Sequence, residues 1–498
     1  MASAVVTLHA PGRQETSEPR FEPRKIAVSF GLIAGGLCAL FAILPSGEAL
    51  LIALPVLAVW VWREPVRGLY VLVAGAAMIE IFPLNFPDSL TDKVPLFLNL
   101  NNTVGFDFPI TPAEILMVIT GAVAVARTAS DQALGWPRGR LFNAYCIYVG
   151  VVLLAEVHGL VSGGDFKLSL WELRPQIYGF IVFVLTGTLL ENREQLKRLA
   201  FIFLLAVGVK ALIGTFRYFV TLHGNLGTGL EVLAHEDSYF LSLFITAGLA
   251  SLVWIKDRRF VVFMTLGSAV AMLTLLANSR RAGLFALAGA VAVIALLAFK
   301  FEPALRKRIA WLCILAVIGG SGFLVYAWDK QYGIQAQLVR PVRSLVDPSD
   351  RDFSSDLYRT AETNNVHITY RTSPIIGVGF GSPFIIAWPM ADISSTYPLW
   401  NVIPHNSLMW VGMRMGALGF AAFWALIGLA VLMGFDLMRT RRDPLIRVVT
   451  AFALAAIAAE IAVGYTDLQL ENYRNLILFG ALLGLLTRLP ALKEARDV

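Results

Sequence analysis

Residues 404–435 read PHNSLMWVGMRMGALGFAAFWALIGLAVLMGF. The apolar part of this stretch is long enough to cross the hydrocarbon core of a bilayer, which takes about 20 helical residues. It follows the longest polar interruption in the chain, residues 329–404, and it opens with the titratable side chain of His405. The stretch therefore predicts a transmembrane helix that begins where a large loop meets the membrane.

Similar apolar runs fill most of the 498 residues. The chain is 57% hydrophobic and 15% charged, with a mean hydropathy of +0.67, which excludes an ordinary soluble domain. We predict an all-α, polytopic membrane protein with about fourteen transmembrane helices. The predicted spans lie near residues 26–44, 46–62, 67–83, 110–128, 141–162, 171–191, 197–220, 238–255, 260–277, 282–299, 309–328, 406–435, 445–464 and 472–489.

The predicted spans divide the chain into five parts. Residues 1–25 form a cytoplasmic tail and residues 26–328 form an N-terminal transmembrane bundle of about eleven helices. Residues 329–404 form a large periplasmic or extracellular loop, in which we expect short amphipathic helices. Three transmembrane helices follow in residues 405–490, and residues 491–498 form a second cytoplasmic tail. No cleavage pattern follows the first apolar run, so we expect a retained helix there.

The positive charges predict the orientation of the bundle. Short loops that stay in the cytoplasm are rich in Lys and Arg. A cytoplasmic N-terminus puts most of the 41 Lys and Arg residues into cytoplasmic loops and tails, and it puts the large loop on the outer side. The net charge of +6 mostly reflects these cytoplasmic Lys and Arg residues, so we expect no nucleic-acid partner.

Five arginines break this rule of charge placement. Arg280 and Arg281 lie in a very short turn that the topology puts outside, and Arg174, Arg217 and Arg474 lie near the outer ends of helices. A charge in hydrocarbon costs several kcal/mol unless it is paired or solvated, so we expect these arginines to face a common polar cavity. Because guanidinium groups make bidentate contacts and a helix start adds N–H donors, the Arg280 turn suits a diphosphate.

Two alternatives remain open for the charges near the outer face. The first is that carboxylates at the same depth form ordinary buried ion pairs with the arginines. These carboxylates are Glu80, Glu156, Glu172, Glu460, Asp467 and Glu471. The second is a divalent ion held by loop residues Asp347, Asp350 and Asp352, although an acidic turn is the plainer interpretation. We expect no metal and no cofactor, and the three cysteines all lie in apolar runs, where they supply no disulfide framework.

The loop and the helix after it contain two glycine patterns. Gly377 and Gly379 follow Pro374 in a turn, where glycines let a backbone approach a ligand closely but also serve ordinary turns. At 3.6 residues per turn, three small residues share the helix face beneath His405, where the alternative interpretation is close helix packing. These three are Gly412, Gly416 and Gly419.

Together these motifs resemble the O-antigen ligase and polymerase superfamily of bacterial cell-surface polysaccharide assembly. The ligase signature is a His followed by Asn, Ser or Gln, nine residues, Gly, two residues and then Gly, Thr or Tyr, and residues 405–419 fit it. Arg280 with Leu284 matches the family's arginine, three residues, leucine element. Residues 374–381 are similar to its Pro-x-x-Gly-x-Gly run. The resemblance covers about residues 200–490.

The resemblance implies a glycosyltransferase of the bacterial inner membrane that moves a glycan from undecaprenyl diphosphate to an acceptor hydroxyl at the outer face. It implies an inverting reaction without a metal, a cofactor or a nucleotide sugar. His405 would act as the base or orient the acceptor, and Arg280 would stabilise the leaving diphosphate. Further substrate contacts would come from Arg281, Arg217, Arg359, Arg174 and Asn406, with Gly377, Gly379, Gly412, Gly416 and Gly419 as structural glycines of the site.

The resemblance leaves the acceptor open. A ligase would use the lipid A core and build lipopolysaccharide, whereas a polymerase would join a second lipid-linked repeat, as in exopolysaccharide assembly. A transporter or flippase would instead favour polar groups near the membrane midplane and internal repeats. Only Lys210 and Arg414 are expected well inside spans, so the enzyme is favoured. The chain also departs from the family at residues 235–238, where many relatives carry a Pro-Asn pair and this chain has His-Glu-Asp-Ser.

Overall fold

The computed structural model describes residues 21–81, 91, 93–100, 109–131, 135–226, 232–330 and 333–493. Within these ranges every regular element is a helix, which confirms the predicted all-α fold. Most of the two predicted cytoplasmic tails, residues 1–25 and 491–498, lies outside the described residues.

A helix occupies each predicted span. These helices are α1 (Pro23–Ile43), α2 (Ser46–Arg63), α3 (Val66–Met78), α5 (Pro112–Asp131), α6 (Arg140–Val161), α7 (Phe166–Leu189), α8 (Arg193–Phe216), α9 (Asp237–Trp254), α10 (Arg258–Ala277), α11 (Arg281–Phe301), α12 (Arg306–Ala327), α15 (Ser407–Thr440), α16 (Pro444–Gly464) and α17 (Tyr473–Arg488). Among the described residues, 13 helices are long and apolar enough to cross a membrane. The remaining predicted span, near residues 67–83, contains the shorter helix α3, which has 13 residues.

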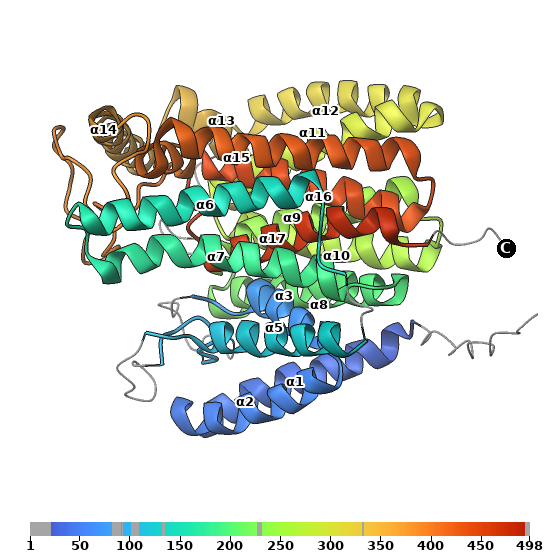
Figure 1. The fold of residues 1–498 in the computed structure, drawn as a ribbon. Coiled ribbons are helices and arrows are strands. Elements are labelled where there is room, and N and C mark those ends of the chain that lie inside the picture. Colours follow the sequence, from blue (N-terminus) through green and yellow to red (C-terminus); the bar gives the residue numbers. More distant parts are fainter. Residues whose placement is uncertain are drawn as a thin grey trace, which may run out of the picture.

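The long helices run side by side in one bundle (Figure 1). Helix α1 begins, and helix α17 ends, at the same end of this bundle. Helix α14 (Asp350–Thr372) and the loop segments around it lie at the opposite end. This arrangement fits an even number of crossings and a multi-pass membrane protein.

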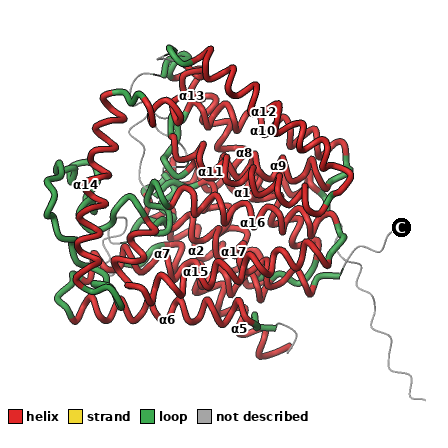
Figure 2. Tube along the Cα trace, turned by 90° about the horizontal axis from the view of Figure 1, so that it is seen from above, coloured by secondary structure: helices red, strands yellow, loops and turns green. Residues whose placement is uncertain are grey.

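The described part of the large loop between α12 and α15 contains two helices. Helix α13 (Gly333–Val346) has 14 residues and fits the expected short helix, whereas α14 has 23 residues and is longer than predicted. Figure 2 shows α14 running across the end of the bundle rather than into it. The chain then passes through an irregular segment, residues 373–406, before α15 begins. The loop is therefore an ordered cover over one end of the bundle.

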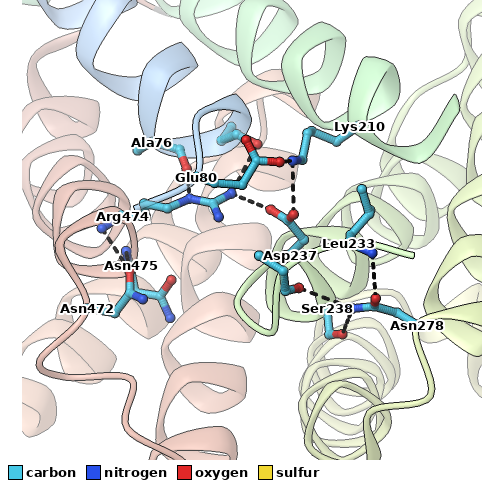
Figure 3. A network of polar contacts seen from close by, with 12 residues as sticks. Ala76, Glu80, Lys210, Leu233, Asp237, Ser238, Asn278, Asn472, Arg474 and Asn475 are labelled. Atoms are coloured by element: carbon cyan, nitrogen blue, oxygen red, sulfur yellow. Dashed lines mark hydrogen bonds and ion pairs between the residues drawn. The ribbon is translucent and has the colours of Figure 1, made fainter. Parts of the chain in front are cut away.

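A network of buried charges joins four helices of the bundle. Lys210 of α8 forms ion pairs with Glu80 and Asp237, the latter at 3.0 Å between Nζ and Oδ2. Arg474 of α17 also pairs with Asp237, and its Nε donates to the carbonyl oxygen of Ala76 at 2.7 Å. Figure 3 shows Lys210 and Arg474 converging on Asp237. Two cations and two carboxylates thus neutralise one another inside the apolar bundle.

We expect replacement of Lys210 with methionine to destabilise the bundle strongly. Removing one partner of a buried ion pair costs about 3–5 kcal/mol, because the opposite charge is left uncompensated. The unfolding temperature of the purified protein in detergent should therefore fall. The double variant Lys210→Met, Glu80→Gln removes one charge of each sign and should recover part of the loss. An unchanged unfolding temperature for Lys210→Met would show that the network does not stabilise the fold.

Candidate active site

His405 is held by a buried carboxylate that sequence analysis did not single out. Its Nδ1 lies 3.0 Å from Oε1 and 3.2 Å from Oε2 of Glu362, and its backbone N–H donates to Oε2 at 2.9 Å. Glu362 belongs to α14 and is 2% exposed, while the imidazole is 21% exposed. Because an ionised carboxylate only accepts hydrogen bonds, this contact requires a proton on Nδ1. In the neutral ring, Nε2 is then the atom with a free lone pair.

Two tyrosines frame the imidazole. The Tyr358 ring meets the His405 ring edge to face, with centroids 5.8 Å apart, and the Tyr397 ring lies at 6.1 Å. Tyr397 also donates from its hydroxyl to the carbonyl oxygen of Ile403 at 3.2 Å. Burial, together with the nearby Glu362, raises the pKa of the Tyr358 phenol, and burial raises that of Tyr397 as well. Both phenols therefore stay neutral beside the histidine.

The imidazole opens onto a cavity of about 780 Å³. One side of the cavity is largely polar and comes from α14, which contributes Arg359, Thr360, Glu362, Thr363, Asn364 and His367 together with Val366 and Tyr370. The other side is largely apolar and comes from α15, which contributes Leu408, Met409, Gly412, Gly416, Ala417, Phe420 and Ala421. A cavity with one polar and one apolar side suits an amphiphilic ligand such as a lipid with a charged head.

Five of the predicted site residues line this cavity: Arg359, His405, Asn406, Gly412 and Gly416. Asn406 is also the N-cap of α15, because its side-chain oxygen accepts a hydrogen bond from the backbone N–H of Met409 at 3.0 Å. The start of α15 is therefore fixed by the residue that follows His405. This cap holds the imidazole at the helix entrance.

The structure does not bring the other four predicted arginines into the same cavity. Arg174 instead lies against Glu114, with 3.3 Å between Nε and Oε1, and its NH1 donates to Asn99 at 2.9 Å. This is a partly buried ion pair, of the kind left open as an alternative, but with a carboxylate that was not among the six named. Arg217 donates to the carbonyl oxygen of Val232 at 2.9 Å. Both arginines thus have partners within their own part of the bundle.

The Arg280 turn faces the start of the large loop. Arg280 contacts Nε2 of His235, a residue of the segment that departs from the family pattern. Arg281 donates to Asp356 at 2.9 Å and to the Ser344 hydroxyl at 2.8 Å, and its Nε lies 3.8 Å from Asp352. The nearest acids to Arg281 thus come from α14, about 70 residues further along the chain. The prediction of a diphosphate site at this turn did not take these acids into account.

A second arginine strengthens this contact between the turn and the loop. Arg340 of α13 donates to both carboxylate oxygens of Asp352, at 2.6 and 3.1 Å, and to the carbonyl oxygen of Ser279 at 3.1 Å. Burial raises the pKa of Asp352, but the hydrogen bonds and charges of Arg340 and Arg281 outweigh it and hold the pKa below its usual range. We call Arg281, Arg340, Asp352 and Asp356 the clasp. The clasp fixes α14, and with it Glu362, to the bundle.

The clasp also bears on the divalent-ion alternative. Asp352, the central acid of that set, is occupied by two guanidinium groups. Within the described ranges, no group of three or more His, Cys, Asp or Glu side chains is placed to hold a metal ion. The acidic turn is therefore an anchoring site for arginines in this structure.

The glycine-rich run packs against the middle of α15. Gly416 has φ 64° and ψ −163° and interrupts the helix. The loop supplies replacement hydrogen bonds there, because the N–H groups of Ala417 and Leu418 donate to the carbonyl oxygens of Pro374 and Ile375, at 2.9 and 3.1 Å. In return, Gly379 N–H donates to the carbonyl oxygen of Arg414 at 3.1 Å. Irregular backbone inside a membrane protein is tolerated where such partners satisfy it.

The same packing explains why glycine is needed on both sides of this contact. Gly377 has φ 75°, and a Cβ there would lie 2.2 Å from the carbonyl oxygen of Arg414. A Cβ on Gly416 would lie 2.3 Å from the carbonyl oxygen of Ile375. Gly379 has φ 77° and lies as tightly against Gly159 of α6. These glycines permit the approach of backbone to backbone, rather than of backbone to ligand, and Gly419 contacts Met415 within its own helix.

A fully buried ion pair fixes the other end of this loop segment. Arg414 donates to Glu172 at 2.5 Å and to the carbonyl oxygens of Gly379, Ser382 and Val402, at 3.1, 2.8 and 2.7 Å. Trp410 donates to the same oxygen of Glu172 at 2.7 Å. Arg414 therefore holds three points of the loop against α7 and α15. Both ionisable residues expected inside spans, Lys210 and Arg414, have such structural partners.

Residues 266–424 match the family model described as O-antigen ligase. This segment of the chain is an O-antigen ligase domain. It contains the Arg280 turn, both loop helices, Glu362, His405 and the interruption of α15 at Gly416. The O-antigen ligase domain thus includes both partners of the histidine and carboxylate pair, whereas Arg174 and Arg217 precede it. A search of the curated proteins gives no match to the chain.

The match confirms the resemblance drawn from the sequence motifs over residues 266–424. In general terms the match supports an O-antigen ligase or polymerase type of function, which is that of a glycosyltransferase-like enzyme of the O-antigen pathway. The O-antigen ligase domain also implies lipid-linked glycan substrates in a membrane setting. His405 and Glu362 both lie within residues 266–424. So do the residues that line their cavity, apart from Tyr465 and Thr466.

Proposed function

We propose that the protein transfers a glycan from undecaprenyl diphosphate to an acceptor hydroxyl, as an O-antigen ligase acting at the outer face of the inner membrane. The observation that carries the proposal is the His405 and Glu362 pair at the polar side of an amphiphilic cavity. The polar side would receive the sugar and the diphosphate. The apolar side along α15 would receive the first part of the polyprenyl chain.

The proposed reaction uses the neutral imidazole of His405, in which Nδ1 carries the proton and Nε2 has the free lone pair. Nε2 of His405 accepts the proton of the acceptor hydroxyl, and Glu362 stabilises the positive charge that then develops on the ring. The acceptor oxygen forms a bond to the anomeric carbon from the face opposite to the diphosphate. The bond from that carbon to the diphosphate oxygen breaks, and its electron pair leaves with the diphosphate. The sugar is joined with inverted configuration.

Arginines stabilise the charge on the leaving diphosphate. Arg359 is the arginine that lines the cavity, so we assign it the role that sequence analysis gave first to Arg280. Arg280 lies in the turn that the clasp connects to α14, the helix of Arg359. Fixed cations near a developing negative charge favour the transition state more than the ground state. Arg281 contributes indirectly, since it anchors α14.

The proposal is tested with the purified full chain, one lipid-linked repeat and lipid A core. We expect core-dependent transfer that continues in EDTA, because arginines perform the charge stabilisation. A ladder of products without added core would replace the ligase by the polymerase, which shares the chemistry and differs in the acceptor. Loss of transfer in EDTA and its return with magnesium would overturn the arginine mechanism. If no glycan is transferred to either acceptor, the protein is not this enzyme, and the transporter alternative becomes the one to test.

A further inference from the structure

A second cavity, of about 630 Å³, lies between the α1–α2 hairpin and helices α3, α5 and α8. It shares no lining residue with the cavity at His405. The hairpin meets the bundle only in part. Phe41, Ala49, Leu50 and Ala53 form a small core of their own, whereas Val61 of α2 belongs to the main core. The cavity therefore occupies the space where hairpin and bundle do not pack against each other.

The lining of this cavity changes in polarity from one end to the other. Its charged members come from the starts of α1, α3 and α8 and from the end of α2. They are Glu22, Lys25, Glu64, Arg67 and Arg198. Farther along α1 and α3 the lining is apolar, with Ile33, Leu37, Phe41, Val71 and Met78. The charged end is the end at which α1 begins, opposite to α14 (Figure 1).

The charged end carries one more cation than it has carboxylates. Lys25 pairs with Glu22 at 2.7 Å, and Arg67 pairs with Glu64 at 2.9 Å. Arg198 adds the further positive charge. The ring of Trp60 lies 5.2 Å from the Arg67 guanidinium, and tryptophans of this kind are enriched at the level of lipid headgroups. A phosphodiester, with its single negative charge, complements this set of groups.

We propose that this cavity binds one glycerophospholipid, with its phosphate at Lys25, Arg67 and Arg198 and its acyl chains between α1 and α3. The apolar lining on α1 lies within a helix long enough to span the bilayer, where acyl chains rather than water surround the protein, and α3 packs beside it as a shorter apolar helix. The bound lipid joins the hairpin to the bundle by packing against both. This site is independent of the glycan transfer proposed for the His405 cavity.

The first experiment is mass spectrometry of the detergent-purified full chain under conditions that retain bound lipid. We expect one phospholipid on the wild-type protein and its loss in Ala34→Phe, which fills the cavity, and in Arg198→Gln. Ala42→Phe is the matched control on α1, because Ala42 is exposed and does not line the cavity. Arg24→Gln is the matched control for charge. Equal retention in Ala34→Phe, or a polyprenyl lipid as the bound species, would overturn the proposal.

The second experiment needs no variant, because Cys38 lines the cavity and is buried, whereas Cys146 and Cys313 are exposed. We expect delipidation to raise the labelling of Cys38 by N-ethylmaleimide, measured by peptide mass spectrometry. Dioleoyl-phosphatidylglycerol should reverse the rise, while dioleoylglycerol, which lacks the phosphate, should not. Labelling of the two exposed cysteines serves as the internal reference. If dioleoylglycerol protects Cys38 as well as the phospholipid does, the charged end does not select the ligand.

Discussion

Replacing His405 with alanine should lower glycan transfer by about 10²–10⁴-fold, the usual contribution of a positioned general base. The reason is that Nε2 of His405 takes the proton of the acceptor hydroxyl as the new bond forms. Binding of the donor does not need this proton transfer, so kcat should fall while KM for the donor changes little. The measurement is the initial rate of transfer by purified protein over a range of lipid-linked donor concentrations.

The cavity itself provides the matched control for this prediction. His367 of α14 lines the same cavity and is exposed, but the hydrogen bond to Glu362 belongs to His405. Since His367 lines the side that would receive the sugar and the diphosphate, we expect His367→Ala to raise KM for the donor while kcat stays close to the wild-type value. If His367→Ala lowers kcat more than His405→Ala does, His405 is not the general base and the mechanism is contradicted.

Replacing Glu362 with glutamine should lower kcat by about 10²-fold, close to the lower limit for losing the base itself. Glutamine has nearly the same size as glutamate, but it has no negative charge to stabilise the protonated ring. Its amide also accepts from Nδ1 less strongly than a carboxylate does. Glu362→Asp keeps the charge at a shorter reach and should recover part of the rate. The experiment compares kcat and KM for the three proteins.

A structural role for Glu362 would give a different pattern. Because the backbone N–H of His405 also donates to Glu362, the substitution can disturb the segment before α15. Nitrogen chemical shifts of the imidazole report which ring atom carries the proton, and they should show a mixture of tautomers in Glu362→Gln. Asp356→Asn, on the same helix, weakens the clasp and should leave the tautomer unchanged. If Glu362→Gln keeps both the wild-type tautomer and the wild-type kcat, the role of Glu362 is only to hold the segment before α15 in place.

The transmembrane architecture could be predicted from sequence because hydropathy is a local property. Each predicted span contains a helix. Among these helices, α3 has 13 residues and is too short to cross a membrane by itself. The large loop was harder to predict, because its conformation depends on distant partners. Helix α14 is polar and reaches 23 residues through contacts such as those of the clasp, which no periodicity in its own sequence encodes.

The candidate site was predictable only in the parts that a local motif defines. His405, Asn406 and Gly416 belong to one signature, and they line one cavity. Glu362 lies 43 residues from His405 among other acidic and polar residues of the loop, so nothing in the spacing singles it out. The arginines were grouped by their depth in the membrane, a criterion that does not separate an ion pair such as Arg174 with Glu114 from a ligand-binding group.

The interruption of α15 at Gly416 has a consequence for engineering of relatives. Residues 374–379 complete the hydrogen bonding of that helix, so the large loop and α15 depend on each other for their structure. A chimaera that exchanges residues 333–404 alone should misassemble, since the donor loop would meet a foreign helix break. Transplanting residues 333–440 as one segment keeps the loop together with the helix break that it completes, and such a chimaera should keep the fold.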